Sequence, residues 1–192
     1  EQTGQRAVEM AANGPKPSEI MTTDAFRNAL VTLQAIGGST NGLVHITAVA
    51  RRLGIKIDLD EFDKIGREVP MLIDLKPSGE HYMENLHESG GLNAMLRELH
   101  PHLALDALTI TGRPLGENIE LGERVPGQTV IRSPGSPISP TGGMAILRGN
   151  LAPGGAIIKH SAASPDLMSH RGRAVVFESL EDLALRVDDP DL

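Results

Sequence analysis

The sequence has 192 residues, enough for one large domain or two small ones. Hydrophobic residues make up 40% of it but aromatic residues only 2%, so the core must be built from Leu, Ile, Val, Ala and Met. The net charge of -7 argues against a nucleic-acid-binding surface. Cysteine is absent, which excludes disulfides, thiolate zinc sites and thiolate-held iron–sulfur clusters within this chain.

The chain opens with a helical pattern over residues 1–12, which Pro15 and Pro17 break. It lacks an initiator methionine and begins inside this pattern, so we expect it to be a piece of a longer protein. The sequence shows neither a long apolar run nor a basic-then-apolar leader pattern. We therefore expect a cytoplasmic protein without membrane or nucleic-acid partners.

Two segments with helical apolar periodicity flank a polar hinge at residues 37–42. The first segment has Thr22 and Thr23 as candidate N-caps, and Gly37 and Gly38 end it because glycine adopts left-handed conformations easily. This pair of helices is the pattern around which the rest of the chain is organised.

The hinge itself has two interpretations. Ser39, Thr40 or Asn41 caps the second helix, which runs to about Leu53, and capping is the ordinary role of these residue types. Alternatively, the hinge and the free N–H groups behind it bind a carboxylate or a phosphate. The string G-G-S-T-N is not a phosphate-loop motif, because no Gly-Lys-Ser/Thr follows it.

The remaining elements follow in chain order. Helices are predicted at 59–68, 82–88 and 92–99, and strands at 71–75, 105–111 and 129–132. Proline and glycine concentrate in residues 133–143, which predicts a linker. After it come strand-like runs at 144–147, 156–159 and 173–177, a hairpin-like turn over 148–156, and one helix at 180–187. These patterns predict a helix-rich α/β part at 1–132, a linker at 133–143 and the beginning of a β-rich domain at 144–192.

Candidate metal ligands have weak patterns. His81, His87, His100 and His102 lie close in sequence but lack the four-residue spacing of the two-histidine helix motif. Glu84 and Glu88 could share one face of a short helix and hold a hard cation, but we favour an ordinary solvated helix edge. Lys76 and Lys159 are isolated cations that could meet an anionic substrate. We assign no metal ligand and no catalytic residue to this chain.

Four strings in this order resemble the dihydroxy-acid dehydratase / 6-phosphogluconate dehydratase family. They are G-G-S-T-N at 37–41, D-L-K-P-S-G at 74–79, H-E-S-G-G at 87–91 and L-R-G-N-L-A-P at 147–153. The segments 160–164 and 170–178 are most similar to the sugar-acid branch of this family, of the arabinonate dehydratase kind. The resemblance covers essentially the whole chain.

The resemblance implies a hydro-lyase that dehydrates a 2,3-dihydroxy acid, such as an aldonate, to a 2-keto-3-deoxy acid through an enol. Such enzymes use an iron–sulfur cluster as Lewis acid beside a magnesium ion, because hydroxide is a poor leaving group. They are homo-oligomers with an N-terminal α/β domain and a C-terminal barrel-like domain. Their partner is a small sugar acid.

The chain corresponds to the middle of the family sequence. The cluster cysteines, the magnesium-binding acidic residues and a modified lysine precede this region in the family, and the serine base and a further metal-binding glutamate follow it. We therefore expect no cofactor and no activity in the isolated chain. Ser39, Thr40 and Asn41 carry over as predicted substrate-binding residues. The alternatives are a dihydroxy-acid dehydratase of branched-chain amino-acid biosynthesis and, for the isolated piece, a non-catalytic assembly or binding module.

Overall fold

A computed structural model describes residues 2–120 and 122–192, apart from the side chain of Gln2. Contacts divide the chain into two compact units at the boundary between Ala162 and Ala163, and each unit is described by itself. In the first unit the helices are α1 (Gln2–Asn13), α2 (Pro17–Ile20), α3 (Thr23–Ala35), α4 (Thr40–Arg52), α5 (Leu59–Glu68), α6 (Met83–Glu88), α7 (Gly91–Glu98), η1 (His100–His102), α8 (Leu115–Ile119) and η2 (His160–Ala162).

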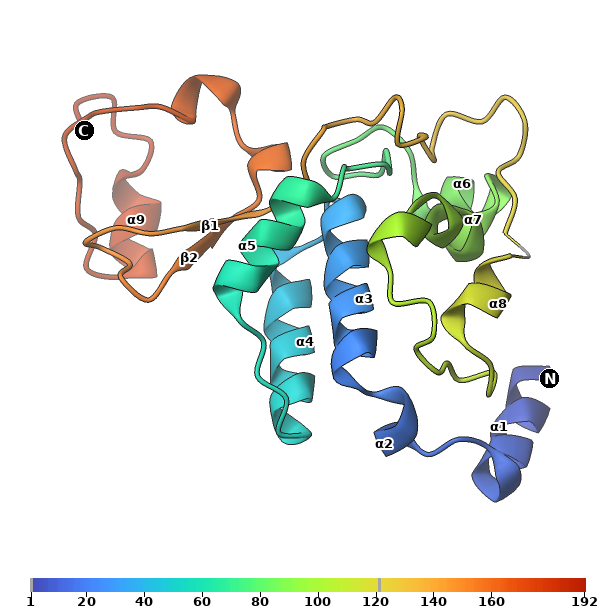
Figure 1. Ribbon diagram of the computed structural model, residues 1–192. Coiled ribbons are helices and arrows are strands. Elements are labelled where there is room, and N and C mark those ends of the chain that lie inside the picture. The colour runs from blue at the N-terminus through green and yellow to red at the C-terminus, as the bar shows by residue number, and fades with distance from the viewer. Residues whose placement is uncertain (1, 121) are drawn as a thin grey trace. The chain divides into compact units, whose positions relative to one another are not determined.

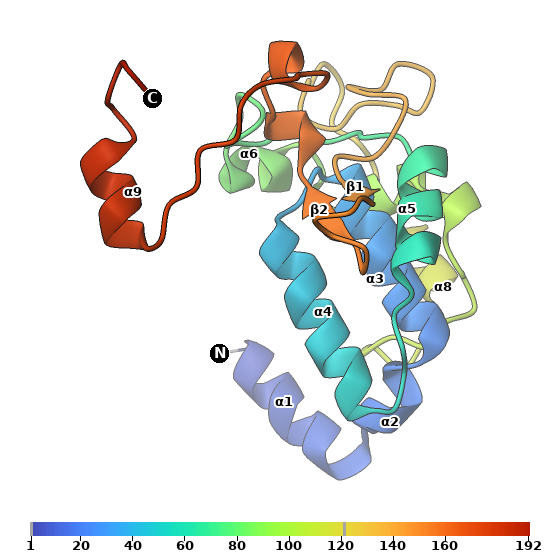
Figure 2. The same cartoon turned by 90° about the vertical axis from the view of Figure 1, so that its left-hand side faces the viewer.

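Helix α3 is the centre of the first unit, with α4 and α5 packed beside it (Figure 1). The same three helices remain adjacent in the view turned by 90° (Figure 2). Thr22 caps α3 as predicted, because its hydroxyl accepts a hydrogen bond from the Ala25 N–H. The helix ends where Gly37 takes a positive φ of 55°. Both boundaries of α3 were therefore predicted correctly.

One hydrophobic core joins these helices to the segments that follow them. It consists mainly of aliphatic side chains, as the scarcity of aromatic residues requires, with Phe62 of α5 as its largest fully buried member. Met144, which follows the Pro/Gly-rich segment, is also buried in this core. Burial of such side chains stabilises the fold by roughly 1.5–3 kcal/mol each.

The predicted strands at 71–75 and 129–132 are not strands but extended segments joined by isolated bridges. Ile73 pairs with Ile131, and Met71 pairs with Ser139. Both segments contribute buried residues, which explains their apolar pattern. The neighbouring segment contains Pro137 and Pro140, which lack an N–H donor, so the pairing beside Met71 cannot extend into a ladder.

The predictions of strands at 105–111 and 173–177 were also wrong. The first segment folds into turns, with one bridge between Leu108 and Pro114. The second is irregular, and Val176 within it is exposed. In the described part of the chain neither segment has a neighbouring strand to complete its hydrogen bonds, so β-propensity alone did not decide its conformation.

A single antiparallel pair forms the sheet of the described residues. It consists of β1 (Ala145–Leu147) and β2 (Ala156–Ile158), with Ile146 opposite Ile157. This confirms the predicted strands and turn around 148–156. The helix-rich character of the chain is likewise confirmed, whereas the β structure of the described residues amounts to this two-stranded sheet and isolated bridges.

The Pro/Gly-rich segment 133–143 contacts the helical core directly. Gly142 N–H donates to the Gly66 carbonyl at 2.7 Å, and Gly143 N–H donates to the Gln34 carbonyl at 3.1 Å. The segment therefore joins the ends of α3 and α5. The division of the longer protein into domains at 1–132, 133–143 and 144–192 stays a prediction.

The second unit contains η3 (Pro165–Leu167) and α9 (Leu180–Arg186). Ser179 caps α9 by accepting from the Asp182 N–H, and Asp182 pairs with Arg186 one turn later. The predicted final helix is thus confirmed. Among the described residues, none of the helices has the length and apolar character needed to cross a bilayer.

Candidate functional site

The hinge between α3 and α4 is the centre of the candidate site. Ser39 is the N-cap of α4, and its hydroxyl accepts a hydrogen bond of 3.0 Å from the Asn41 N–H. Ser39 and Asn41 are exposed and Thr40 is half-buried. The side chains of Thr40 and Asn41 make no hydrogen bond within residues 2–120 and 122–192, so Ser39 alone performs the capping role. Two of the three predicted residues are therefore available to a ligand.

Two glycines bring distant segments into contact at the first residue of the hinge. A Cβ placed on Gly143 would lie 2.5 Å from the Cα of Gly37, a distance that only side-chain-free backbones can accept. The Met71 side chain also packs against Gly37, because its sulfur would lie 2.7 Å from a Cβ built on that glycine. The hinge is thus held against residues more than 100 positions later in the chain, which sequence patterns did not indicate.

Ser161, in η2, lies directly against this contact. Its Oγ is 3.1 Å from a Cβ built on Gly143 and 3.5 Å from one built on Gly37. Among the described residues, Ser161 Oγ is the one buried side-chain polar atom that has no hydrogen-bond partner. Sequence reasoning used this segment only for the family resemblance, and no periodicity or spacing singled out this hydroxyl.

Gln34 lies near the end of α3, just before the hinge. It is fully buried, and its Oε1 accepts a hydrogen bond of 3.1 Å from the Met144 N–H. Its Nε2 donates to the Phe62 carbonyl at 3.4 Å. One side chain thereby joins α3, α5 and the segment before β1, because each of its polar atoms must find a partner in the core.

Charged groups tie the β1–β2 hairpin to α5. Asp63 Oδ1 accepts a 2.8 Å hydrogen bond from the Ile146 N–H, and its Oδ2 pairs with Arg67 at 2.6 Å. Burial of the Asp63 carboxyl opposes ionisation, but the Ile146 hydrogen bond and the charges of Arg67 and Arg148 outweigh it and lower the pKa of Asp63. Arg148 also forms an ion pair with Asp60.

Lys159 follows β2 and is half-buried. Desolvation by burial lowers the pKa of its ammonium group. Within the described residues it has no salt-bridge partner. It stands two positions before Ser161, on the segment that reaches the hinge.

The other candidates from the sequence do not assemble into a metal centre. His81 Nε2 lies 3.3 Å from Thr129 Oγ1, and Glu88 accepts a hydrogen bond from Asn85 of its own helix. No group of three or more His, Asp or Glu side chains suited to a metal ion is present in the described ranges. Lys76 lies 4.0 Å from the centre of the Tyr82 ring and donates to its hydroxyl at 2.7 Å.

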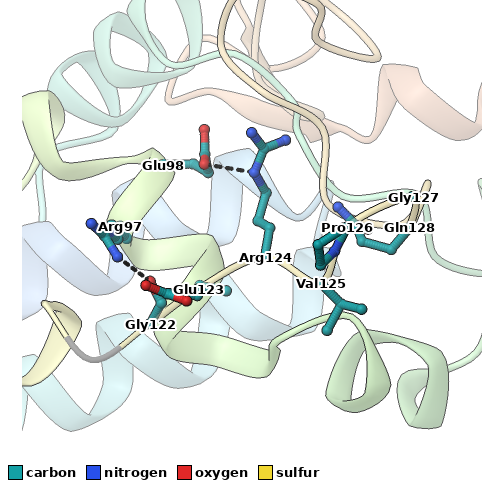
Figure 3. A pocket seen from close by; sticks show the side chains of 10 residues that line it. Arg97, Glu98, Gly122, Glu123, Arg124, Val125, Pro126, Gly127 and Gln128 are labelled. Carbon is teal, nitrogen blue, oxygen red and sulfur yellow. Dashed lines mark hydrogen bonds and ion pairs between the residues drawn. The ribbon is translucent and has the colours of Figure 1, made fainter.

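A separate polar cavity of about 490 Å³ lies between α7 and residues 122–128 (Figure 3). Arg97 donates to the Gly122 carbonyl at 2.8 Å, and Arg124 pairs with Glu98 at 2.8 Å. Both guanidinium groups already have a partner within the protein, one a backbone carbonyl and the other a carboxylate. The cavity is therefore a weaker anion-binding site than its two arginines suggest.

Comparison with known proteins places the whole chain in one family. The model of the N-terminal part of the dihydroxy-acid/6-phosphogluconate dehydratases matches residues 1–118, and that of the C-terminal part matches residues 129–191. The hinge lies in the first match, and Gly143 and Ser161 lie in the second. The cavity of Figure 3 falls largely between the two matches.

Individual relatives fall into two groups by name. An L-arabinonate dehydratase of Rhizobium leguminosarum bv. trifolii is 44% identical over 99% of this chain, and an L-arabonate dehydratase of Azospirillum brasilense is 46% identical over 99% of it. A dihydroxy-acid dehydratase of Caldicellulosiruptor saccharolyticus is 46% identical over 94% of it. This chain spans 33% of the length of each relative.

The chain belongs to the dihydroxy-acid/6-phosphogluconate dehydratase family, as the resemblance of its four motifs predicted. By their names these proteins are dehydratases, the class of hydro-lyases that remove water. The chain corresponds to about one third of such a protein.

Proposed function

We propose that the full-length protein containing this chain dehydrates a sugar acid of the aldonate class to a 2-keto-3-deoxy acid. The supporting observation is the 44–46% identity, over 99% of this chain, to two relatives named as arabinonate (arabonate) dehydratases. In the reaction C2 loses a proton and C3 loses its hydroxyl group, which leaves as water. The resulting enol then tautomerises to the 2-keto product.

The part of this chain in that reaction is to hold the acid. The N-terminal N–H groups of α4 lie at the positive end of the helix dipole, which favours a carboxylate. The Thr40 hydroxyl and the Asn41 amide are free to donate further hydrogen bonds beside it. The proposed substrate-binding residues are therefore Thr40 and Asn41, with Ser39 fixing the start of the helix.

An iron–sulfur cluster and Mg²⁺ remain part of the proposal for the full-length protein, where they would supply Lewis-acid assistance to the leaving hydroxide. The donor set of this chain does not fit them. It has no cysteine for a cluster, and its described residues gather no group of three metal-binding side chains. Their ligands would come from other regions of the full-length protein.

Three further features belong to the same proposal. The β1–β2 hairpin would form the beginning of a β-rich, barrel-like domain in the complete protein. The full-length protein would act in the cytoplasm as a homo-oligomer. Light scattering of the full-length protein would measure the oligomeric state. Neither nucleic acid nor a membrane is a proposed partner.

The decisive experiment is an anaerobic assay of the full-length protein. L-arabinonate, other aldonates and a branched 2,3-dihydroxy acid are supplied in turn, and formation of the 2-keto acid is measured. We expect the highest kcat/KM with an aldonate. A 3-deoxy aldonate is the matched control, because it has no C3 hydroxyl to lose.

The alternatives give different results in this assay. A dihydroxy-acid dehydratase of branched-chain amino-acid biosynthesis would turn over the branched acid with the highest kcat/KM. That alternative is supported by the relatives named dihydroxy-acid dehydratase, at 46% identity over 94% of the chain. Turnover of none of the acids by a folded protein would reject both and favour an assembly or binding module.

A further inference from the structure

The hydroxyl of Ser161 is the feature that packing does not explain. A buried polar atom without a partner costs roughly 1–3 kcal/mol, and such atoms in folded proteins call for a specific reason. The η2 backbone does not need this hydroxyl, since the Ser161 N–H already donates to the Gly143 carbonyl at 3.3 Å. An alanine of nearly the same volume would fill the space at lower cost.

The location of Ser161 connects this hydroxyl to the hinge. Its Oγ lies against Gly37 and Gly143, the two glycines whose backbones meet. Gly37 begins the hinge that leads to Ser39, the cap of α4. The residue as a whole is half-buried, although its Oγ is covered.

We propose that Ser161 is a specificity-determining residue, whose hydroxyl hydrogen-bonds to a hydroxyl group of a polyhydroxy acid held at the hinge. This inference rests on the proposed function. A hydroxyl can both donate and accept, so it suits the hydroxyl-rich chain of an aldonate. It offers nothing to an alkyl tail, which would leave the buried oxygen unpaired.

Half-buried Lys159 supports the same assignment. It precedes η2 on the segment that brings Ser161 to the hinge, and its ammonium group has no ion-pair partner in the described part of the chain. A cation and a free hydroxyl on one segment complement an acid that carries both a carboxylate and hydroxyl groups.

The test compares Ser161→Ala with the wild-type full-length protein on two substrates, L-arabinonate and a branched 2,3-dihydroxy acid with an alkyl tail. We expect kcat/KM for L-arabinonate to fall about tenfold, the effect of losing one neutral hydrogen bond. We expect kcat/KM for the branched acid to change less than twofold. The melting temperature should stay the same or rise, because the substitution removes an unpaired buried group.

Two further measurements complete the test. Ser164→Ala is the matched control, because Ser164 is exposed and its side chain makes no hydrogen bond in the described residues. It should leave both substrates unaffected. The rise in melting temperature caused by saturating L-arabinonate gives a readout independent of turnover, and it should shrink in Ser161→Ala only.

The outcomes separate this inference from the proposed function. An active wild type in which Ser161→Ala changes neither substrate, or lowers both equally, rejects the role of Ser161 alone. A lower melting temperature with unchanged selectivity shows a purely structural serine and rejects it as well. A wild type that turns over neither acid rejects the proposed function and, with it, this inference.

Discussion

Gly37 and Gly143 touch backbone to backbone, although 105 positions separate them in sequence, and this contact holds the α3–α4 hinge against the segment before β1. No side chain fits between them, since a Cβ on Gly143 would lie 2.5 Å from Gly37 Cα. The Oγ of Ser161 lies close to both glycines. The shape of the candidate site therefore depends on two residues that have no side chains.

Gly143→Ala should destabilise the protein by about 1–3 kcal/mol, because the added methyl group forces the two backbones apart. Gly149→Ala is the matched control, since nothing lies within 4 Å of a Cβ at that position. Urea denaturation of both variants of the full-length protein measures the difference. Equal stabilities would show that the close contact is not maintained in solution.

Substitutions in the hinge should separate capping from ligand binding. Ser39→Ala removes the cap of α4 and should lower stability by about 1 kcal/mol. The side chains of Thr40 and Asn41 cap nothing in the described structure, so Thr40→Ala and Asn41→Ala should barely change the melting temperature. Because both side chains are proposed to contact the substrate, the two variants should lower kcat/KM of the full-length enzyme. If these two variants lose stability but keep kcat/KM, the hinge is structural and the substrate-binding assignment is wrong.

The stability of the protein should depend on Asp63 in acid. Its folded pKa is lowered from the ordinary 3.8, so the carboxylate contributes stability above the unfolded pKa and loses it as the pH falls through the lower folded pKa. Asp63→Asn should therefore lower stability near neutral pH and flatten its decline below about pH 4. Asp106→Asn is the control, because Asp106 is exposed and has no ion pair in the described ranges. Chemical denaturation across pH 2 to 7 measures both variants, and parallel curves for Asp63→Asn and the wild type would contradict the prediction.

The isolated 192-residue chain should show no dehydratase activity and should bind no stoichiometric iron, because it contains no cysteine to hold a cluster. Anaerobic reconstitution with iron and sulfide, followed by desalting and iron analysis, tests this. A full-length relative treated in parallel is the positive control. A stable cluster absorbance in the isolated chain would refute the prediction.

Local sequence signals were sufficient where a segment makes its own hydrogen bonds. Rules that act over a few residues predict a glycine at the end of α3 and the β1–β2 turn, and they narrow each cap to a few candidates. The structure then selects Thr22 as the cap of α3 and Ser39 as the cap of α4. The motifs also identified the family: three of the four strings lie within the N-terminal match at 1–118, and the fourth lies within the C-terminal match at 129–191. The same local rules failed at 105–111, where an apolar pattern had no neighbouring strand to pair with.

Only the tertiary structure could decide contacts between distant segments. The proline and glycine content of residues 133–143 predicts a linker, and that prediction stands. It does not reveal that Gly143 N–H donates to the Gln34 carbonyl or that Gly143 packs on Gly37. The buried hydroxyl of Ser161 could not be found from its neighbours in sequence, because whether a polar atom has a partner depends on which backbones fold around it. Spacing rules describe one helix or one turn. The candidate site forms where three distant segments meet, namely the hinge at 37–42, the segment that ends at Gly143, and η2 with Ser161.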